Sequence, residues 1–522
     1  MTATGSLPGV PDQIPLRPSA PAPTPLRDLL GWLGERVLEV RGGDAATVTG
    51  VTISSQRVTP GDLYVAPAGA RAHGASYATE AVSDGAVAVL TDPAGADLAE
   101  PAGVPVVVVE SPRAVVGDLA ARVYGHPAER LRMVAVTGTQ GKTTTTRLAE
   151  AALTAAGVPA AVIGTVGTRV AGQELKTSLT TPEAPDLHAL FAVMVEQQVA
   201  ACAMEVSSHA LVMGRVDGVV FDVACFTNLG RDHLDFHADV EEYFAAKASL
   251  FTPERCRRAV VNVDDEHGRR LVAQAQVPVR TFSASGAEAD WRATDVELEP
   301  TGSRFTVHPP EGEPFPAGVP LTGDFNVANA LCAIAGLAEA GFDAVAVATA
   351  MAASGGVPGR LEQVDAGQDF LAVVDYAHKP DAVTAALRAL RPLTTGRLVV
   401  VLGAGGDRDP GKRPLMGEAA ARLADVLVVT DDNPRSEDPA SIRAAVRSGA
   451  DAVPEGERAE VHVEGDRRAA IRLALDLAGP GDTVVVAGKG HETGQEVHGT
   501  VHPFDDRVVL REELTHVTGR VR

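Results

Sequence analysis

Short apolar runs, each about the length of a strand, recur along the chain and are separated by polar loops and Ala-rich segments. Over residues 26–130 the runs DLYVA (62–66), AVAVL (86–90) and VPVVVV (104–109) alternate with Ala-rich stretches of helical character. This alternation predicts a small α/β domain. The first residues are rich in proline and lack periodicity, so we expect a disordered tail over residues 1–25.

Two further blocks follow, over residues 131–357 and 358–522, and both contain strand-length runs rich in Val, Ala and Leu. Near-continuous apolar strands with helices between them predict buried parallel sheets. Ligands of such sheets bind beyond the carboxyl ends of the strands, so the loops after these runs are the candidate sites. The runs are LRMVAV (131–136), AACAMEV (200–206), FDVACF (221–226), RAVVNV (258–263), FLAVVD (370–375), RLVVVLG (397–403) and DTVVVAG (482–488).

The composition narrows the possible functions. With 46 basic and 68 acidic residues among 522, the formal net charge is −22. This charge argues against a nucleic-acid partner, and any anionic ligand must be held by local donors. The four cysteines (202, 225, 256 and 332) have neither paired nor zinc-type spacing, so we expect reduced thiols and a cytoplasmic protein. The longest apolar runs are of strand length, so we expect no membrane insertion.

The loop after the run at 131–136 has the composition of a phosphate-binding turn, VTGTQGKTTTT (136–146). A strand, a glycine turn, a lysine and threonines that open a helix direct backbone N–H groups and a positive helix end toward phosphates. Lys142 would reach the outer phosphates and Thr143 would ligate Mg²⁺, so the sequence predicts ATP binding. Val136 stands where the usual spacing has glycine, and a purely structural turn is the alternative. The predicted ATP contacts here are Gly138, Thr139, Gln140, Gly141, Lys142, Thr143 and Thr144.

Other polar residues follow further strands of the same block. Glu205 and His233 end or follow adjacent predicted strands and are candidate magnesium ligands; a hydrogen-bonded polar residue at a strand end is the alternative. Lys247 lies on a predicted helix, EEYFAAKASLF, with Tyr243 and Phe251 on the same face. That pattern alone favours a solvated or salt-bridged lysine. ATP binding by itself does not distinguish a kinase, a switch and a ligase.

Seven segments, in sequence order, closely resemble the Mur ligases, enzymes that join an amino acid to a UDP-muramyl peptide using ATP. The resemblance covers nearly all of the chain except the tail. It implies a three-domain α/β architecture: a UDP-sugar-binding domain (26–130), a central ATP-binding domain with a P-loop and a parallel sheet (131–357), and a Rossmann-like amino-acid-binding domain (358–522). The segments are TGTQGKTTTT, MEVSSHAL, TNLGRDHLDFH, YFAAKASLF, GDFNVANALCA, GVPGRLE and DYAHKPDAV.

Within the family, GDRDPGKRPLMG (406–417), DNPR (432–435) and GKGHE (488–492) resemble the members that add meso-diaminopimelate to UDP-N-acetylmuramoyl-L-alanyl-D-glutamate. The resemblance therefore implies this reaction in peptidoglycan precursor synthesis, with ATP, Mg²⁺ and an acyl phosphate, and we expect a monomer. Three alternatives remain. A lysine-adding ligase of the family conflicts with the arginine of DNPR. A folate-polyglutamylating ligase lacks the UDP-sugar domain. A P-loop switch or kinase leaves the Lys247 helix and the loops of the third domain unexplained.

The resemblance also implies roles for individual residues. The lysine that matches Lys247 is carbamylated in the family and helps to hold a second Mg²⁺, so the implied metal ligands are Thr143, Glu205, His233 and carbamylated Lys247. Lys142, His233 and Lys247 are the expected catalytic residues. Further ATP contacts are implied for Asn329, Arg360, Asp375 and His378. UDP-muramyl-peptide contacts are implied for Ile53, Ser55, Ala70, Arg71, Ala72, Thr180, Thr181, Ser207 and Arg215. The chain departs from the family pattern near the uridine site at Ser54, Gln56, Leu179 and Met213.

The stretch TDDNPRSEDP (430–439) places a single guanidinium, Arg435, among four acids. Our hypothesis is that its donor fork pairs with the far carboxylate of meso-diaminopimelate, which lysine lacks. Glu492 and Asp432 would accept from the far ammonium, and Arg408 would hold another carboxylate. The alternative is an arginine that ties its own loop through Asp431 or Glu437. The predicted amino-acid site is completed by Asn433, Pro434 and Gly488.

Overall fold

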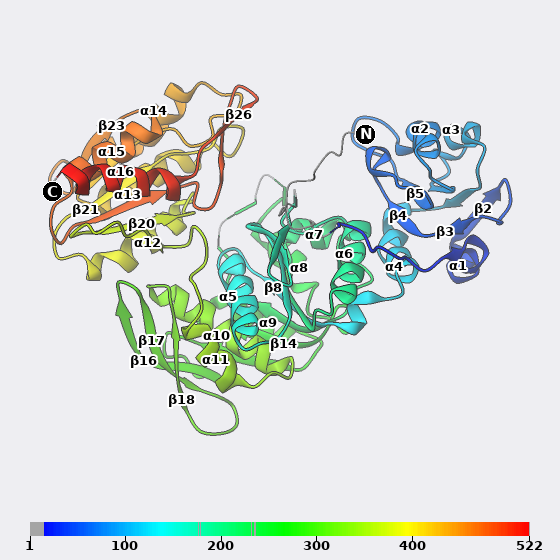
Figure 1. The fold of residues 1–522 in the computed structure, drawn as a ribbon, viewed down its shortest axis with the longest axis horizontal. Coiled ribbons are helices and arrows are strands. Elements are labelled where there is room, and N and C mark those ends of the chain that lie inside the picture. Colours follow the sequence, from blue (N-terminus) through cyan, green and yellow to red (C-terminus); the bar gives the residue numbers. More distant parts are fainter. Residues whose placement is uncertain (1–14, 176, 178, 231, 234–235, 521–522) are drawn as a thin grey trace, which may run out of the picture.

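Three sheets, one in each of the ranges expected from the apolar runs, organise the computed structural model of the chain (Figure 1). It describes residues 15–175, 177, 179–230, 232–233 and 236–520. The sheets have five, eleven and six strands, and two-stranded pairs lie beside them. We call the parts that carry them the first lobe (26–130), the middle lobe (131–357) and the third lobe (358–522); they are blue, cyan to green, and yellow to red in Figure 1.

The first lobe is a mostly parallel sheet between two layers of helices. Its helices are α1 (Leu26–Leu33), α2 (Ala78–Ser83), α3 (Ala96–Ala99) and α4 (Pro112–Val123), and its strands are β2 (Val37–Arg41), β3 (Thr47–Val48), β4 (Gly50–Thr52), β5 (Asp62–Ala66), β6 (Ala88–Thr91) and β7 (Val106–Val109). β4, β5, β6 and β7 are parallel, and β2 pairs antiparallel with β7. α1 and α4 cover one face, and α2 and α3 cover the other.

The segment before α1 is ordered from residue 15. The prediction of a disordered tail is therefore wrong for residues 15–25, while residues 1–14 lie outside the described part of the chain. Arg17 donates to the buried carboxylate of Asp62 at 2.6 Å. β1 (Thr24–Pro25) pairs with β3, and the backbone N–H of Ser19 donates to Glu196 of the middle lobe at 3.0 Å. Composition does not reveal such anchors because each is a single contact whose partner lies far away in the sequence.

The middle lobe contains the largest sheet. Its strands are β8 (Arg132–Thr137), β9 (Ala160–Gly164), β10 (Gly167–Val170), β11 (Gln173–Leu175), β12 (Ala201–Glu205), β13 (Phe221–Phe226), β14 (Cys256–Asn262), β15 (Val279–Ser283), β16 (Trp291–Glu299), β17 (Gly302–His308) and β18 (Phe315–Val319). Its helices are α5 (Lys142–Ala155), α6 (Ala184–Glu196), α7 (Ser208–Val212), α8 (Val240–Ala248), α9 (Glu266–Gln274), α10 (Asp324–Glu339) and α11 (Ala344–Ala352).

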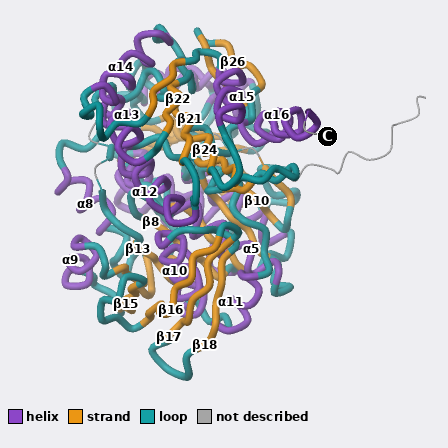
Figure 2. Tube along the Cα trace, turned by 90° about the vertical axis from the view of Figure 1, so that its left-hand side faces the viewer, coloured by secondary structure: helices purple, strands orange, loops and turns teal. Residues whose placement is uncertain are grey.

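Seven of these strands are parallel neighbours in the order β9, β12, β8, β13, β14, β15 and β16, and antiparallel strands extend both edges. The helices α5, α10 and α11 cover one face, and α6, α8 and α9 cover the other. Figure 2 shows β16, β17 and β18 at the end of the lobe that points away from the third lobe. The prediction that Glu205 and His233 follow adjacent strands is wrong. Their strands, β12 and β13, are separated by β8. The two residues therefore approach the phosphate loop from opposite sides.

The third lobe repeats the same layering. Its strands are β19 (Glu362–Gln363), β20 (Leu371–Asp375), β21 (Leu398–Leu402), β22 (Val426–Val429), β23 (Glu460–Val463) and β24 (Thr483–Ala487), and a hairpin of β25 (Gly494–Val497) and β26 (Thr500–Pro503) lies apart. Its helices are α12 (Pro380–Leu390), α13 (Lys412–Leu423), α14 (Pro439–Asp451), α15 (Arg467–Leu477) and α16 (Asp506–Arg520). Apart from β19 the sheet is parallel, in the order β20, β24, β21, β22 and β23. α12, α13 and α14 cover one face, and α15 and α16 cover the other.

All four cysteines are buried and free. Among the described residues, none of the helices combines the length and the apolar character that crossing a membrane requires.

Candidate active site

A cavity of about 750 Å³ lies between the middle and third lobes, beyond the carboxyl ends of β8, β12 and β20. Six of its lining residues are basic and four are acidic, although the whole chain carries −22. The local excess of cations suits an anionic ligand. The basic residues are Lys142, Arg215, Lys247, Arg360, Lys379 and Arg408, and the acidic ones are Glu205, Asp264, Asp324 and Asp375.

The predicted phosphate loop forms the floor of this cavity, and residues 139–144 all line it. The ammonium of Lys142 folds over the loop and donates to the carbonyls of Gly138 at 2.7 Å and Thr139 at 3.1 Å. Burial lowers the pKa of Lys142 to about 8. The backbone N–H groups of Thr139 and Gln140 both donate to Asn228 at 2.9 Å, and the first turn of α5 presents backbone N–H groups that a helix itself does not pair. The local structure therefore agrees with phosphate binding.

Two glycines make this turn possible. Gly138 and Gly141 have φ values of 148° and 86°, which L side chains rarely adopt. A Cβ on Gly138 would lie 1.9 Å from the hydroxyl of Thr227, and one on Gly141 would lie 2.3 Å from the side-chain oxygen of Asn329. The loop is thus held between β13 and α10. Asn329, predicted at the adenine side, does reach the loop and the cavity.

Glu205 and Thr143 lie together beside the loop. The hydroxyl of Thr143 donates to the carboxylate of Glu205 at 2.9 Å, and Glu205 is buried. The same carboxylate accepts from the backbone N–H of Thr165 at 2.7 Å. Because β12 pairs with β8 in register, Glu205 lies opposite Val136 and ends next to the phosphate loop. A hydroxyl and a carboxylate oxygen at this place are ligands that Mg²⁺ accepts alongside nucleotide phosphates.

Lys247 is buried, which contradicts the expectation of a solvated lysine from its helical pattern. Only 1% of the residue is exposed, and its ammonium donates to the carbonyl of Gly138 at 2.8 Å. The ring of Tyr243 lies 4.6 Å from the same nitrogen. Burial, reinforced by the charge of Lys142, holds the pKa of Lys247 well below its usual range. The predicted helix is α8, but it ends at Ala248, before Phe251, and the face that carries Tyr243 and Lys247 packs against the phosphate loop.

His233 lines the cavity on the opposite side from Glu205 and has a left-handed backbone, with φ of 54°. Its Nε2 lies 3.2 Å from the carboxylate of Asp232, and burial lowers the pKa of His233 to about 4. Asp232 also forms an ion pair with Lys379 of the third lobe. Sequence reasoning did not single out this link between the two lobes. The segments TNLGRDH and DYAHKP each contain two charged residues, and the sequence does not indicate which of them pair.

The nucleotide contacts predicted in the third lobe gather on the far side of the cavity. The guanidinium of Arg360 stacks over the ring of Tyr376, 4.6 Å from its centroid. Asp375 accepts from the backbone N–H groups of Leu361 at 2.7 Å and Ala377 at 2.8 Å. His378 donates to the carbonyl of Tyr376 at 2.7 Å, and burial lowers its pKa to about 3. Tyr376 lines the cavity but was not predicted.

The predicted UDP-muramyl-peptide contacts fall into two groups. Thr180, Thr181, Ser207 and Arg215 line the cavity, and Arg215 is fixed by Glu183 at 2.9 Å. The others are in the first lobe, where, among the described residues, they do not contribute to this cavity. Of these, Ile53 packs on the core of that lobe, Ser55 begins a short 3₁₀ turn (Ser55–Arg57), and Ala70, Arg71 and Ala72 form an exposed loop.

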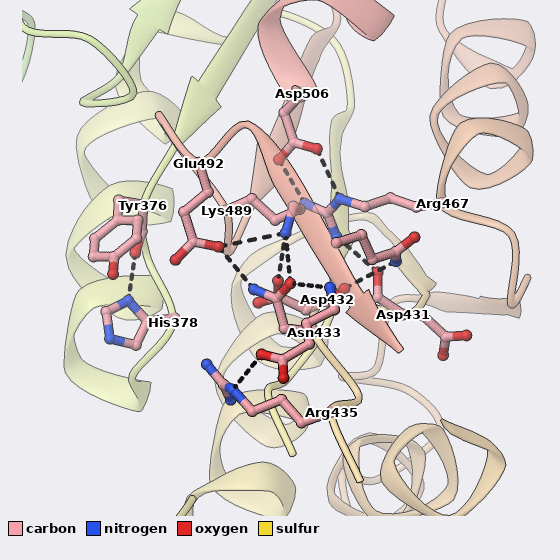
Figure 3. A network of polar contacts seen from close by, with 12 residues as sticks. Tyr376, His378, Asp431, Asp432, Asn433, Arg435, Arg467, Lys489, Glu492 and Asp506 are labelled. Atoms are coloured by element: carbon pink, nitrogen blue, oxygen red, sulfur yellow. Dashed lines mark hydrogen bonds and ion pairs between the residues drawn. The ribbon is translucent and has the colours of Figure 1, made fainter. Parts of the chain in front are cut away.

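Most of the predicted amino-acid site forms a polar cluster in the third lobe (Figure 3). Asn433 donates to Glu492 at 2.7 Å, and a Cβ on Gly488 would lie 3.0 Å from Asp432. Arg408 alone of the set lines the central cavity, among the residues described. Burial raises the pKa of Tyr376, and the nearby charges of Glu492 and Asp432 raise it further. Tyr376 also lines the cavity, so the cluster adjoins the cavity at this residue.

Arg435 projects from a strained loop beside this cluster. Its φ is 53°, its N–H donates to the carbonyl of Glu496 at 2.9 Å, and its own carbonyl accepts from His498 at 2.6 Å. The hairpin of β25 and β26 thereby holds the loop. The guanidinium donates to the carbonyl of Gly406 at 2.6 Å and lies 3.6 Å from the carboxylate of Glu496, with a quarter of the side chain exposed.

The alternative partners for Arg435 are engaged elsewhere. Asp431 pairs with Arg443, and Glu437 accepts from Arg413 at 2.7 and 2.8 Å. The alternative in which Arg435 ties its loop through Asp431 or Glu437 is therefore wrong; in this structure the guanidinium binds Gly406 and Glu496 instead. Sequence reasoning also missed Lys489, whose ammonium lies inside the cluster. Its signal was available in GKGHE, but a lysine in a loop normally indicates a solvated side chain.

A phosphate loop at the carboxyl edge of a parallel sheet, with a second α/β lobe across the cavity, defines a nucleotide-dependent α/β enzyme. Three family models match in order: the Mur ligase family catalytic domain at residues 47–124, the Mur ligase middle domain at 136–337, and the glutamate ligase domain of Mur ligases at 359–490. The chain belongs to the Mur ligase family, whose members are ATP-dependent, ADP-forming ligases of acids and amino acids.

Similar proteins extend over nearly the whole chain. A protein of Streptomyces avermitilis named UDP-N-acetylmuramoyl-L-alanyl-D-glutamate–2,6-diaminopimelate ligase is 57% identical over 97% of this chain and 99% of its own length. A protein of the same name from Synechococcus elongatus is 44% identical over 94% and 98%. A solved structure of a ligase of that name is 34% identical, covers 90% of this chain and 95% of its own, and has a TM-score of 0.65.

Proposed function

We propose that the chain catalyses the ATP-dependent addition of meso-diaminopimelate to UDP-N-acetylmuramoyl-L-alanyl-D-glutamate. One observation carries this proposal: in the third lobe the partly exposed guanidinium of Arg435 projects from the same loop as Asp432 and Asn433, and Asn433 binds the carboxylate of Glu492. The far end of meso-diaminopimelate carries one carboxylate and one ammonium, whereas lysine carries the ammonium alone. A cation near acids complements both charges of meso-diaminopimelate. With lysine, the charge of the arginine has no carboxylate of the substrate to pair with. The names of relatives at 44–57% identity support the same substrate.

The reaction would proceed in two transfers. A carboxylate oxygen of the D-glutamyl side chain attacks the γ-phosphorus of ATP, and ADP leaves, which gives an acyl phosphate. The amine nitrogen of diaminopimelate then attacks the acyl carbon, loses a proton, and expels phosphate to form the amide. Lys142 would stabilise the transferred phosphoryl group from the middle lobe, and Arg360 and Lys379 would do so from the third lobe. Asn329, Asp375 and His378 would contact the rest of the nucleotide.

A magnesium ion fits part of this site. The hydroxyl of Thr143 and the carboxylate of Glu205 supply hard oxygen donors beside the phosphate loop. Among the described residues, no three His, Cys, Asp or Glu side chains gather as a ready metal site, so the nucleotide phosphates would complete the coordination. Bound there, Mg²⁺ would neutralise phosphate charge as phosphoryl transfer develops.

Lys247 fits a metal only after modification. As an ammonium it donates to Gly138, and as a free amine it offers no oxygen. Its lowered pKa favours the neutral amine, which can add to carbon dioxide and release a proton, giving a carbamate. The carbamate would supply carboxylate-like oxygens near His233, and we propose this form in the active enzyme.

The remaining assignments follow the same geometry. Thr180, Thr181, Ser207 and Arg215 would hold the muramyl peptide in the cavity, and the first-lobe residues Ile53, Ser55, Ala70, Arg71 and Ala72 would hold the uridine end. Buried, unpaired cysteines suit a reducing compartment, and this supports a location in the cytoplasm.

The test is product formation from UDP-muramyl dipeptide, ATP and either diaminopimelate or lysine, measured by mass spectrometry together with phosphate release. We expect diaminopimelate to be preferred by about 10³-fold in kcat/KM, less than in a fully buried polar site because a quarter of the Arg435 side chain is exposed. Arg435→Ala should lose most of that preference by slowing the reaction with diaminopimelate and not with lysine. A phosphorylated product without a new amide, or an Arg435→Ala enzyme with unchanged preference, would contradict the proposal.

A further inference from the structure

The ammonium of Lys489 lies buried among three residues of the proposed amino-acid site (Figure 3). Its side chain is 0% exposed. Nζ lies 3.0 Å from the side-chain oxygen of Asn433, 3.4 Å from the carboxylate of Glu492 and 3.5 Å from that of Asp432. Lys489 directly follows Gly488 at the end of β24, so its backbone is fixed by the central strand of the sheet. A lysine is rarely buried in this way unless its charge is used.

Lys489 fixes the orientation of Asn433 and, through it, that of Glu492. The side-chain oxygen of Asn433 accepts from Lys489 and also from the backbone N–H of Glu496 at 3.0 Å. Both of these donors require an oxygen, so the amide nitrogen must point the other way, where it donates to Glu492 at 2.7 Å. The ammonium of Lys489 and the backbone N–H of Glu496 therefore together determine how the amide of Asn433 and the carboxylate of Glu492 are presented.

The charges around Lys489 do not balance. Behind it, Arg467 and Asp506 form a buried bidentate pair at 2.6 and 2.7 Å, and this pair is neutral as a unit. Lys489 then faces two carboxylates, Asp432 and Glu492, with one positive charge. The cluster thus retains one negative charge, which an ammonium group on a ligand would neutralise. The buried position makes such complementarity strong.

We propose that Lys489 is a positioning residue of the amino-acid site, which holds Asn433, Glu492 and Asp432 in the arrangement that receives the far ammonium of diaminopimelate. This inference rests on the proposed function. Lys489 does not itself contact the substrate ammonium, since two cations would repel each other. It keeps the two acids aligned for that ammonium and favours the ionised form of Glu492.

The electrostatic part of this role concerns Glu492. Burial and the charge of Asp432 raise the pKa of Glu492, whereas Lys489 and Asn433 lower it. Removing the ammonium of Lys489 therefore raises the pKa of Glu492 further. As the pH falls, Glu492 then becomes protonated at a higher pH and accepts the substrate ammonium less well. The other titratable or charged groups that face this cluster are Tyr376, His378, Lys412, Arg467 and Asp506.

The experiment compares wild type, Lys489→Met and Lys489→Gln in steady-state assays with each of the three substrates varied in turn, over a range of pH. Lys489→Met should raise the KM for diaminopimelate by about 30-fold or more, as expected for truncating one partner of a buried charge pair. The KM values for ATP and UDP-muramyl dipeptide should stay unchanged. In wild type, kcat/KM for diaminopimelate should rise as Glu492 ionises. In Lys489→Met this rise should occur at a pH about one unit higher. Lys489→Gln keeps a donor for Asn433, so it should show the smaller KM effect but the same pH displacement.

Arg443→Gln is the matched control. Arg443 pairs with Asp431, which belongs to the same loop as Asp432 and Asn433 but is not one of the residues that Lys489 contacts. It should leave the pH profile in place. The pH displacement should also disappear when Lys489→Met is combined with Glu492→Gln, which has no carboxyl group to titrate. If both Lys489 variants change all three KM values alike, or leave the pH profile unmoved, Lys489 only supports the fold and the inference is overturned. If wild type does not use diaminopimelate at all, the proposed function fails and the inference fails with it.

Discussion

His188 lies where α6 of the middle lobe meets α4 of the first lobe, and it is completely buried. Its Nε2 is 3.0 Å from the carbonyl of Asp217, which can only accept, so Nε2 carries the proton. Among the described residues, its Nδ1 has no hydrogen-bond partner. Protonating Nδ1 would place an uncompensated charge in the interface. Burial accordingly lowers the pKa of His188 to about 4.

This residue makes stability depend on pH. The unfolded chain binds a proton near the usual histidine pKa of about 6.5, whereas the folded chain resists it until about 4. Between these limits the unfolded state holds more protons, so stability falls as the pH falls, by about 3 kcal/mol in total for this one group. We expect the thermal midpoint of His188→Gln to change less than that of wild type when the pH is lowered through this window. His462→Gln, at a partly exposed position beside Glu460, is the control and should behave as wild type. Equal pH dependence in all three proteins would show that His188 does not limit acid stability.

At the scale of elements, α5 is bounded by two glycines with left-handed backbones, Gly141 before it and Gly157 after it. They differ in their surroundings. A Cβ on Gly141 would meet Asn329 at 2.3 Å, whereas one on Gly157 would have nothing within 4 Å. Gly141→Ala therefore combines backbone strain with a clash inside the phosphate loop, and Gly157→Ala has the strain alone.

Both alanine variants should lose about 1 kcal/mol of unfolding free energy from the strained backbone. Only Gly141→Ala should also weaken nucleotide binding, by about tenfold or more, because the loop must move to accommodate Asn329. Isothermal titration with ATP or ADP, alongside thermal unfolding, separates the two effects. Equal affinities in the two variants would mean that the contact with Asn329 does not shape the nucleotide site.

The pattern of apolar residues predicts some of these elements better than others. The run at 221–226 becomes β13 with the same bounds, because it is buried on both faces and lies between parallel neighbours. β16 escapes such reasoning, since only Trp291 and Ala293 of the strand are buried and the rest includes several charges. Lys247 and Lys489 escape it for another reason. Their burial is imposed by Gly138 and by Asn433, and the spacing of residues along one helix or loop contains no information about such distant partners.

At the scale of the whole molecule, charge is distributed unevenly. The chain carries −22, yet the cavity between the lobes is lined by more basic than acidic residues. An anionic nucleotide therefore approaches a protein that repels it overall and is bound by cations from two lobes at once. Salt screens the repulsion over about 10 Å or less but affects partly buried contacts less, so added salt should not weaken nucleotide binding steeply.

The ion pair between Asp232 and Lys379 joins those two lobes, with 16% and 22% of the side chains exposed. Burial raises the pKa of Asp232, but Lys379 and His233 together outweigh burial and lower this pKa to about 2, so the carboxylate stays ionised at neutral pH. Asp232→Asn should loosen the contact and raise the radius of gyration of the ligand-free enzyme in X-ray scattering. The KM for ATP should rise by about 5- to 30-fold, which corresponds to about 1–2 kcal/mol for a pair between the exposed and buried limits. Glu241→Gln removes an exposed pair with Arg270 inside the middle lobe and should change neither quantity. The third lobe supplies Arg360 and Lys379 to the cavity. If the radius of gyration rises in Asp232→Asn while the KM for ATP stays normal, the middle lobe binds the nucleotide alone.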